Sequence, residues 1–177
     1  RLLPHLKGWG RSRHQYRTYG KHRLTRMEKH EERLRKGERL CSKKLIDTLF
    51  GPGRSHAMTV FPLKAVYRLI DSKSEVSTSQ ETLTEPNVQL LVSVPKKHFK
   101  RAVKRNRVKR QVREAYRKHK RLVTQSVDKL TDKQLLIAFI WLSDELTDSD
   151  TIEQRVCNLL QRIGERILKD KETDIKR

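Results

Sequence analysis

Residues 96–121 are the part of the sequence whose residue types could do specific chemistry. They include fourteen Lys or Arg residues and one acidic residue, Glu114, so the stretch carries a net charge of +13. On a helix at roughly 100° per residue, five polar residues of this stretch fall within about 80° of arc. These residues are Asn106, Arg110, Arg113, Arg117 and Arg121. Because a planar guanidinium matches two phosphate oxygens at once, this row predicts contact with a nucleic-acid backbone.

A solvated helix face is the ordinary alternative for a charged run. Such faces usually mix the two signs to form pairs at i, i+4, and within this stretch only Glu114 is available for pairing. The other side of the same helix is apolar and suited to packing on a core. Its residues are Val108, Val112, Ala115, Tyr116, His119, Leu122 and Val123. We therefore expect a helix over about 100–124, with one face in the core and the other on nucleic acid.

The order of residues in this helix resembles the arginine-asparagine-arginine signature of the bacterial ribonuclease P protein subunit. Residues 100–114 read KRAVKRNRVKRQVRE, and the flanking segments 93–97 and 39–50 also fit that family. The resemblance spans residues 36–168. It implies a subunit that binds the catalytic RNA and the single-stranded 5′ leader of precursor tRNA. The assembled endonuclease then removes the leader and generates the mature 5′ end of the tRNA.

The resemblance also implies which residues bind RNA. The positions that match the family's motif are Arg105, Asn106, Arg107, Lys109, Arg110 and Arg113. We expect the neighbouring cations of the same stretch to contribute as well: Lys96, Lys97, Lys100, Arg101, Arg117 and Arg121. In the family, the open sheet face and the first helix form a cleft for the leader. Phe50 and Tyr67 match positions of that kind, and ordinary core packing is the alternative for both.

Five further segments must position the basic helix. Their hydrophobic patterns predict helices over 43–50 and 151–169 and strands over 58–70, 88–94 and 135–142. We expect the first two strands to be antiparallel. The long helix between the last two strands makes a crossover, so those two strands should be parallel.

The order α-β-β-α-β-α predicts a small single α+β domain whose sheet includes a parallel crossover around the basic helix. Three or four strands backed by two helices would leave one sheet face partly open. The resemblance implies a left-handed crossover, against the usual right-handed rule.

The charge of +21 divides the chain into regions. Residues 1–40 carry +9 and residues 96–121 carry +13, so the remainder sums to −1. We expect a basic, disordered arm over 1–36, a folded RNA-binding domain over 37–170 and a short tail over 171–177. Basic residues interleaved with aromatic ones, as in the arm, suit single-stranded RNA, and a solvated tail is an equally good reading.

Chemistry carried by the protein itself is not indicated. Cys41 and Cys157 form no disulfide framework or zinc motif. The acids are scattered, and neither His98 nor His119 has an acid at helical spacing, so we expect no catalytic residue and no metal bound by the protein. The resemblance places Mg²⁺ in the RNA-containing holoenzyme.

No segment predicts a membrane span or a signal-peptide core, so we expect a cytoplasmic protein. The implied partners are ribonuclease P RNA and precursor tRNA, with no obligate protein partner. Two other classes stay open. One is a structural or ribosome-associated RNA-binding protein. The other is a DNA-binding module, which is disfavoured because no heptad zipper adjoins the basic helix.

Overall fold

The computed structural model describes residues 33–71, 86–130 and 132–175, and within them the chain forms one mixed sheet. The strands are β1 (His56–Val60), β2 (Leu63–Asp71), β3 (Val88–Ser93) and β4 (Lys133–Trp141). Their order across the sheet is β1-β2-β4-β3. Strand β4 is antiparallel to β2 and parallel to β3. The predicted parallel pair around the basic helix is therefore confirmed, and the left-handed sense of that connection stays a prediction.

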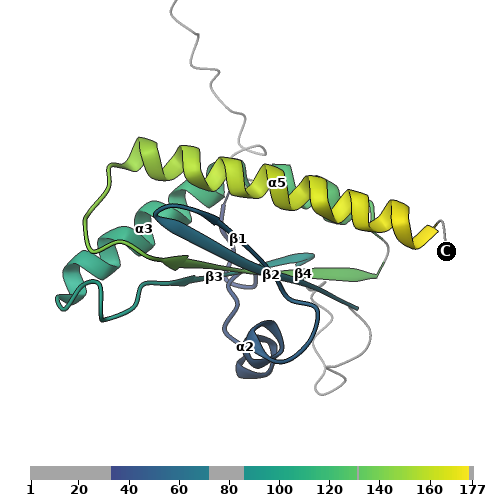
Figure 1. The fold of residues 1–177 in the computed structure, drawn as a ribbon, viewed down its shortest axis with the longest axis horizontal. Coiled ribbons are helices and arrows are strands. Elements are labelled where there is room, and N and C mark those ends of the chain that lie inside the picture. The colour runs from purple at the N-terminus through teal and green to yellow at the C-terminus, as the bar shows by residue number, and fades with distance from the viewer. Residues whose placement is uncertain (1–32, 72–85, 131, 176–177) are drawn as a thin grey trace, which may run out of the picture.

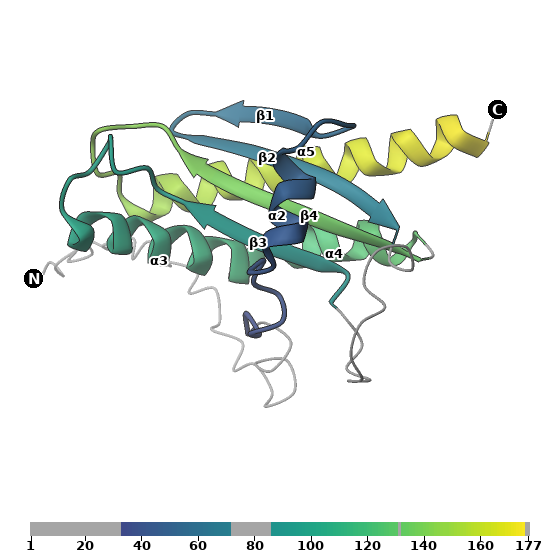
Figure 2. The ribbon, with the colours of Figure 1, turned by 90° about the horizontal axis from the view of Figure 1, so that it is seen from below.

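Helices cover both faces of this sheet. They are α2 (Lys43–Phe50), α3 (Ala102–His119), α4 (Arg121–Asp128) and α5 (Ser149–Ile175). Figure 1 shows α3, α4 and α5 together on one face and α2 alone on the other. Seen from the α2 side, that helix lies in front of the middle of the sheet and leaves β1 uncovered (Figure 2). The α+β class is confirmed, with three helices rather than two on one face.

The sequence of β4 explains why the sheet has helices on both sides. Successive residues of a strand point to opposite faces, and β4 is apolar almost throughout. Ile137 and Phe139 face the larger core under α3, α4 and α5. Leu136 and Ala138 face a smaller core with Leu49 of α2. A strand that is apolar on both faces must be covered on both faces.

The apolar run 58–70 is two strands, so the prediction of one strand is wrong. Phe61 and Pro62 form the turn, and Val60 pairs with Leu63 to close the hairpin. Proline has no backbone N–H to donate to a ladder, which favours a turn at this position. The segment 88–94 is also not the neighbour of this hairpin, because β4 lies between β2 and β3.

The predicted helix over 100–124 is divided into α3 and α4 at Lys120. The hydroxyl of Thr124 donates to the Lys120 carbonyl oxygen at 2.9 Å, and back-bonding of this kind bends helices. The last helix, α5, is longer than the predicted range of 151–169. It includes five residues, 171–175, of the predicted tail.

Residues 33–40 are held against the folded domain. The Lys120 ammonium, on a residue only 8% exposed, donates to the Arg33 carbonyl oxygen at 2.9 Å and to Glu38 Oε1 at 2.7 Å. Arg39 forms a parallel bridge to Leu90 at the edge of β3. Four residues of the predicted arm, 33–36, thus belong to this anchored segment. Residues 1–32, and most of the polar loop expected over 71–87, lie outside the described residues.

Candidate nucleic-acid interface

The predicted RNA-binding residues lie on α3, on the turn before it and at the start of α4. Eight of the twelve are exposed: Lys96, Lys97, Lys100, Arg101, Asn106, Arg107, Arg110 and Arg121. The other four are partly buried: Arg105, Lys109, Arg113 and Arg117. On the opposite side of α3, Val108, Val112, Ala115 and Tyr116 are buried, as the periodicity predicts. The helix therefore presents its cations outward, and their contact with RNA stays a prediction.

Arg105 has a structural partner that its place in the motif does not reveal. Its guanidinium donates to the carbonyl oxygens of Phe99 and Lys100, both at 2.7 Å. Phe99 is 3% exposed and belongs to the core. Arg105 thus fastens the turn that carries Lys96, Lys97 and Lys100 to the first turns of α3.

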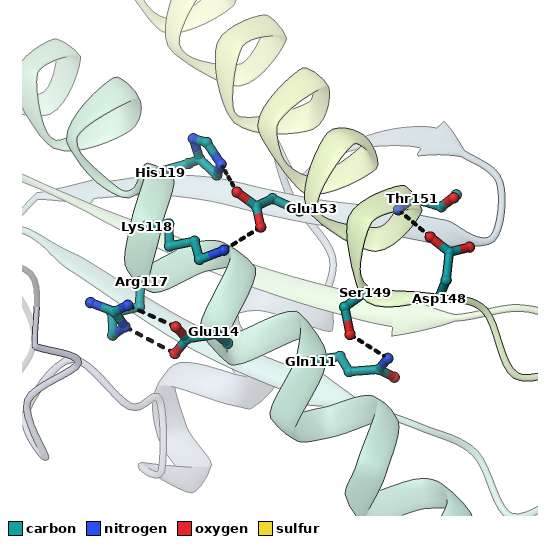
Figure 3. Close-up of polar contacts among 9 residues, drawn as sticks. All are labelled: Gln111, Glu114, Arg117, Lys118, His119, Asp148, Ser149, Thr151 and Glu153. Carbon is teal, nitrogen blue, oxygen red and sulfur yellow. Dashed lines mark hydrogen bonds and ion pairs between the residues drawn. The ribbon is translucent and has the colours of Figure 1, made fainter. Parts of the chain in front are cut away.

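Arg117 is paired within its own helix. Its Nε and Nη2 donate to the two oxygens of Glu114 at 2.9 and 2.7 Å (Figure 3). The hydrogen bond from Arg117 is the main reason that the pKa of Glu114 lies below its usual value. A phosphate approaching this end of α3 therefore meets a guanidinium that already holds a carboxylate.

Glu153 of α5 is a second acid that pairs with the basic helix α3. The sequence did not predict this pairing. Its two oxygens accept from Lys118 Nζ at 2.5 Å and from His119 Nε2 at 3.0 Å (Figure 3). The bond from Lys118 is the largest cause of a lowered pKa at Glu153, and the same bond raises the pKa of Lys118. His119 is partly buried, not the interior histidine suggested by its position on the apolar stripe. The pair is 34 residues apart, so helical spacing within α3 could not reveal it.

Two further polar contacts join α3 and the turn before it to distant segments. Gln111 donates to Ser149 Oγ at 2.9 Å, beside the start of α5 (Figure 3). His98 Nδ1 lies 2.7 Å from Asp144 Oδ1 in the loop after β4, and the other ring nitrogen is buried without a hydrogen-bond partner in the described part of the chain. These contacts position the helix, and neither forms a nucleophile with a base.

The row predicted on one helix does not continue through its last member. Asn106, Arg110, Arg113 and Arg117 lie on α3, whereas Arg121 is the first residue of α4. Arg121 lines a groove of about 500 Å³ together with Arg35 and Glu38 of the anchored segment 33–40 and Thr124 of α4. The arginine row therefore ends where residues 33–40 join the fold.

Phe50 and Tyr67, the two predicted cleft residues, lie on opposite faces of the sheet. Phe50 is 48% exposed at the end of α2. The α2 face of the sheet also has three partly buried apolar residues, Val66, Ile70 and Leu91. Tyr67 is 1% exposed and packs in the core under the helix layer, because β2 turns this residue away from α2. Tyr67 is therefore not placed to line a cleft beside Phe50.

The titratable residues of the described ranges, 33–71, 86–130 and 132–175, do not gather into a metal site. No group of three His, Cys, Asp or Glu side chains among them could hold an ion. Cys41 and Cys157 are both free. None of the helices in these ranges is long and apolar enough to cross a membrane.

Known proteins similar to this chain agree with the motif on α3. The family model for ribonuclease P matches residues 34–164. A ribonuclease P protein component of Porphyromonas gingivalis strain W83 is 47% identical over 133 residues, which cover 74% of this chain and 86% of that protein. One from Chlorobium phaeobacteroides is 31% identical over 140 residues, covering 76% and 90%.

A solved structure, the ribonuclease P protein from Thermotoga maritima, is 23% identical to this chain with a TM-score of 0.49. The match covers 71% of this chain and 97% of that one. The family model and the two relatives carry the assignment. The chain belongs to the ribonuclease P protein family.

Proposed function

We propose that the exposed cations of α3 bind ribonuclease P RNA and that the complex removes the 5′ leader of precursor tRNA. The observation that carries this proposal is the exposure of Arg107 and Arg110. Both side chains are exposed, and neither forms an ion pair within the described residues. Guanidiniums that hold no carboxylate can donate to phosphate oxygens without first breaking an ion pair. Loss of condensed counterions from the RNA then favours binding.

The leader binds on the other side of the sheet in this proposal. Phe50 offers an exposed ring at the end of α2, and Val66, Ile70 and Leu91 supply apolar surface on the same face. Unpaired bases stack on aromatic side chains for about 1–3 kcal/mol each. The sheet would separate the catalytic RNA, held by α3, from the leader, held near α2.

Cleavage itself is assigned to the RNA. The described residues offer no cluster of carboxylates or histidines of the kind that holds a catalytic metal. In the complex, Mg²⁺ bound by RNA would supply the activated water and stabilise the leaving oxygen. The protein would position the leader and offset the electrostatic repulsion between the two RNAs. We expect it to act in the cytoplasm.

Reconstitution tests this function. The full chain is mixed with ribonuclease P RNA from Porphyromonas gingivalis and a precursor tRNA at limiting Mg²⁺, and 5′ cleavage is followed, with protein alone and RNA alone as controls. We expect rapid cleavage only when both components are present. Cleavage by protein alone would place the chemistry in the protein. A protein that binds RNA without stimulating cleavage would instead be a structural RNA-binding protein.

A further inference from the structure

Helix α5 carries a second row of cations that its net charge conceals. Between residues 149 and 170 there are four basic and four acidic residues, so this part of the helix is neutral overall. At 100° per residue, however, the four cations fall within about 60° of arc. They are Arg155, Arg162, Arg166 and Lys169. We call these four residues the α5 row.

The α5 row faces away from α3. Glu153, which binds Lys118 and His119 of α3, lies about 160° around the helix from Arg155. Met58 of β1, by contrast, lines a groove together with Arg162 and Arg166. The row therefore runs along the flank of α5 that adjoins β1.

The three arginines of the α5 row are open to a ligand. All four members of the row are exposed. In the described part of the chain, Arg155 and Arg162 form no hydrogen bond or ion pair, and Arg166 forms no ion pair. A solvated helix face normally pairs its cations with acids one turn away. Guanidiniums left unpaired on one flank are instead typical of a phosphate-binding surface.

A groove lies at the C-terminal half of the row. Its volume is about 330 Å³, and its lining consists of Met58, Arg162, Glu165, Arg166, Lys169 and Asp170. Three cations against two acids leave it net positive. This space is large enough for a phosphate group with its sugar, since small-ligand sites begin at roughly 300 Å³.

We propose that the α5 row is a second binding surface for ribonuclease P RNA, with a phosphate seated in the groove between Arg162 and Arg166. This inference rests on the proposed function. The catalytic RNA is the expected occupant because α5 and α3 belong to the same helix layer (Figure 1). The leader would lie on the α2 side, with the sheet in between. The protein would then hold the catalytic RNA along both flanks of the helix layer.

The salt dependence of RNA binding tests this surface. Full-length Arg162→Gln/Arg166→Gln is compared with a control, Lys43→Gln/Lys44→Gln, which removes the same charge from exposed residues of α2. The Kd for Porphyromonas gingivalis ribonuclease P RNA is measured against salt. For the α5 variant we expect a slope of log K against log salt that is smaller by about 1–2, because each lost phosphate contact removes roughly 0.7–0.9. Affinity should fall about tenfold, and the control should keep the wild-type slope.

Other outcomes would overturn the inference. A wild-type slope for the α5 variant would show that the α5 row does not bind the RNA. An equal loss of affinity in both variants would show that only net charge matters. A loss confined to precursor tRNA binding would assign the α5 row to the substrate. Wild-type protein that neither binds the RNA nor stimulates cleavage would contradict the proposed function itself, which separates the two failures.

Discussion

The arginines of α3 are not equivalent, although the sequence presents them as one motif. Arg105 holds the turn at Phe99 and Lys100, and Arg117 holds Glu114. Arg107 and Arg110 are exposed and form no ion pair within the described residues. Substitution of the first two should therefore disturb the protein as well as its binding, whereas the second two can be tested for binding alone.

Replacing Arg110 and Arg113 with Ala should weaken RNA binding without unfolding the protein. Both side chains lie away from the buried stripe of α3, and surface changes of this kind usually alter stability by no more than about 0.5 kcal/mol each. We expect the Kd for the catalytic RNA to rise about tenfold and the salt slope to fall by roughly 1–2. Binding titrations at several salt concentrations, with melting curves, measure both. Unfolding of the variant would mean that this face of α3 supports the core.

Glu153→Gln should make the stability of the protein less dependent on pH. The pKa of Glu153 is lowered from 4.5 in the folded state, mainly by Lys118. A lowered carboxyl pKa contributes stability above the unfolded value, and this contribution disappears as pH falls through the folded value. Because the group is partly exposed, the effect should be at most about 1 kcal/mol.

The measurement is the Tm of wild type and Glu153→Gln from about pH 7 down to pH 3.5, chosen to span that titration. Wild type should melt higher at neutral pH, and the difference should shrink below pH 4.5, the ordinary carboxyl value. A difference that widens toward acid would show that protonated Glu153 is a better partner for Lys118 than ionised Glu153.

At the scale of elements, the junction of α3 and α4 connects the basic helix to the beginning of the described chain. Lys120 is the only residue between the two helices, and its ammonium reaches the Arg33 carbonyl oxygen and Glu38. The segment that it holds continues to the bridge between Arg39 and Leu90. One side chain therefore ties α3, α4 and the outer edge of β3 together.

Lys120→Ala should release this segment. Glu38 would lose its cation in a largely buried position, and breaking such a pair costs about 3 kcal/mol. We expect faster hydrogen exchange at the amides of Leu40 and Leu90, which bond across the bridge. Lys118→Ala, with a side chain 45% exposed, is the matched control and should leave both amides protected. Unchanged exchange in Lys120→Ala would mean that other contacts hold the segment.

Local patterns predicted the elements better than their arrangement. The helix over 43–50 and the buried stripe of α3 follow from spacing alone, because a helix repeats within a few residues. The turn at Pro62 was missed because apolar residues on both sides made 58–70 look continuous. The insertion of β4 between β2 and β3 and the pairing of Glu153 with Lys118 depend on contacts far apart in the chain. The partners of Arg105 and Arg117 are local, but helix periodicity alone does not show which arginine uses them.

At the scale of the whole molecule, the anchored segment determines where the basic N-terminal region can be removed cleanly. Residues 1–32 include nine basic and three acidic residues, a net charge of +6. The first described residue, Arg33, accepts a hydrogen bond from Lys120, the neighbour of Arg121 at the end of the arginine row. We expect that region to add to RNA affinity, since cations near a polyanion increase binding at moderate salt.

Deletion of residues 1–32 should raise the Kd for ribonuclease P RNA and reduce its salt slope, while the Tm stays unchanged. The cut leaves Arg33 and Glu38 with Lys120. A longer deletion, of residues 1–36, should also lower the Tm because it removes one of the two acceptors of Lys120. Binding identical to wild type after the shorter deletion would show that the region does not contact RNA.

The bridge between Arg39 and Leu90 has a consequence for behaviour at high concentration. The outer strand of a sheet carries unpaired backbone groups that can recruit a strand from another molecule, which is a common route to aggregation. The Leu90 amide and carbonyl are already bonded to residues 38 and 40 at 2.8 and 3.0 Å. At the opposite edge, β1 is only five residues long. The edge of β3 is thus paired at Leu90 and the opposite edge is short, so we expect little association of copies of this protein through their sheet edges at high concentration.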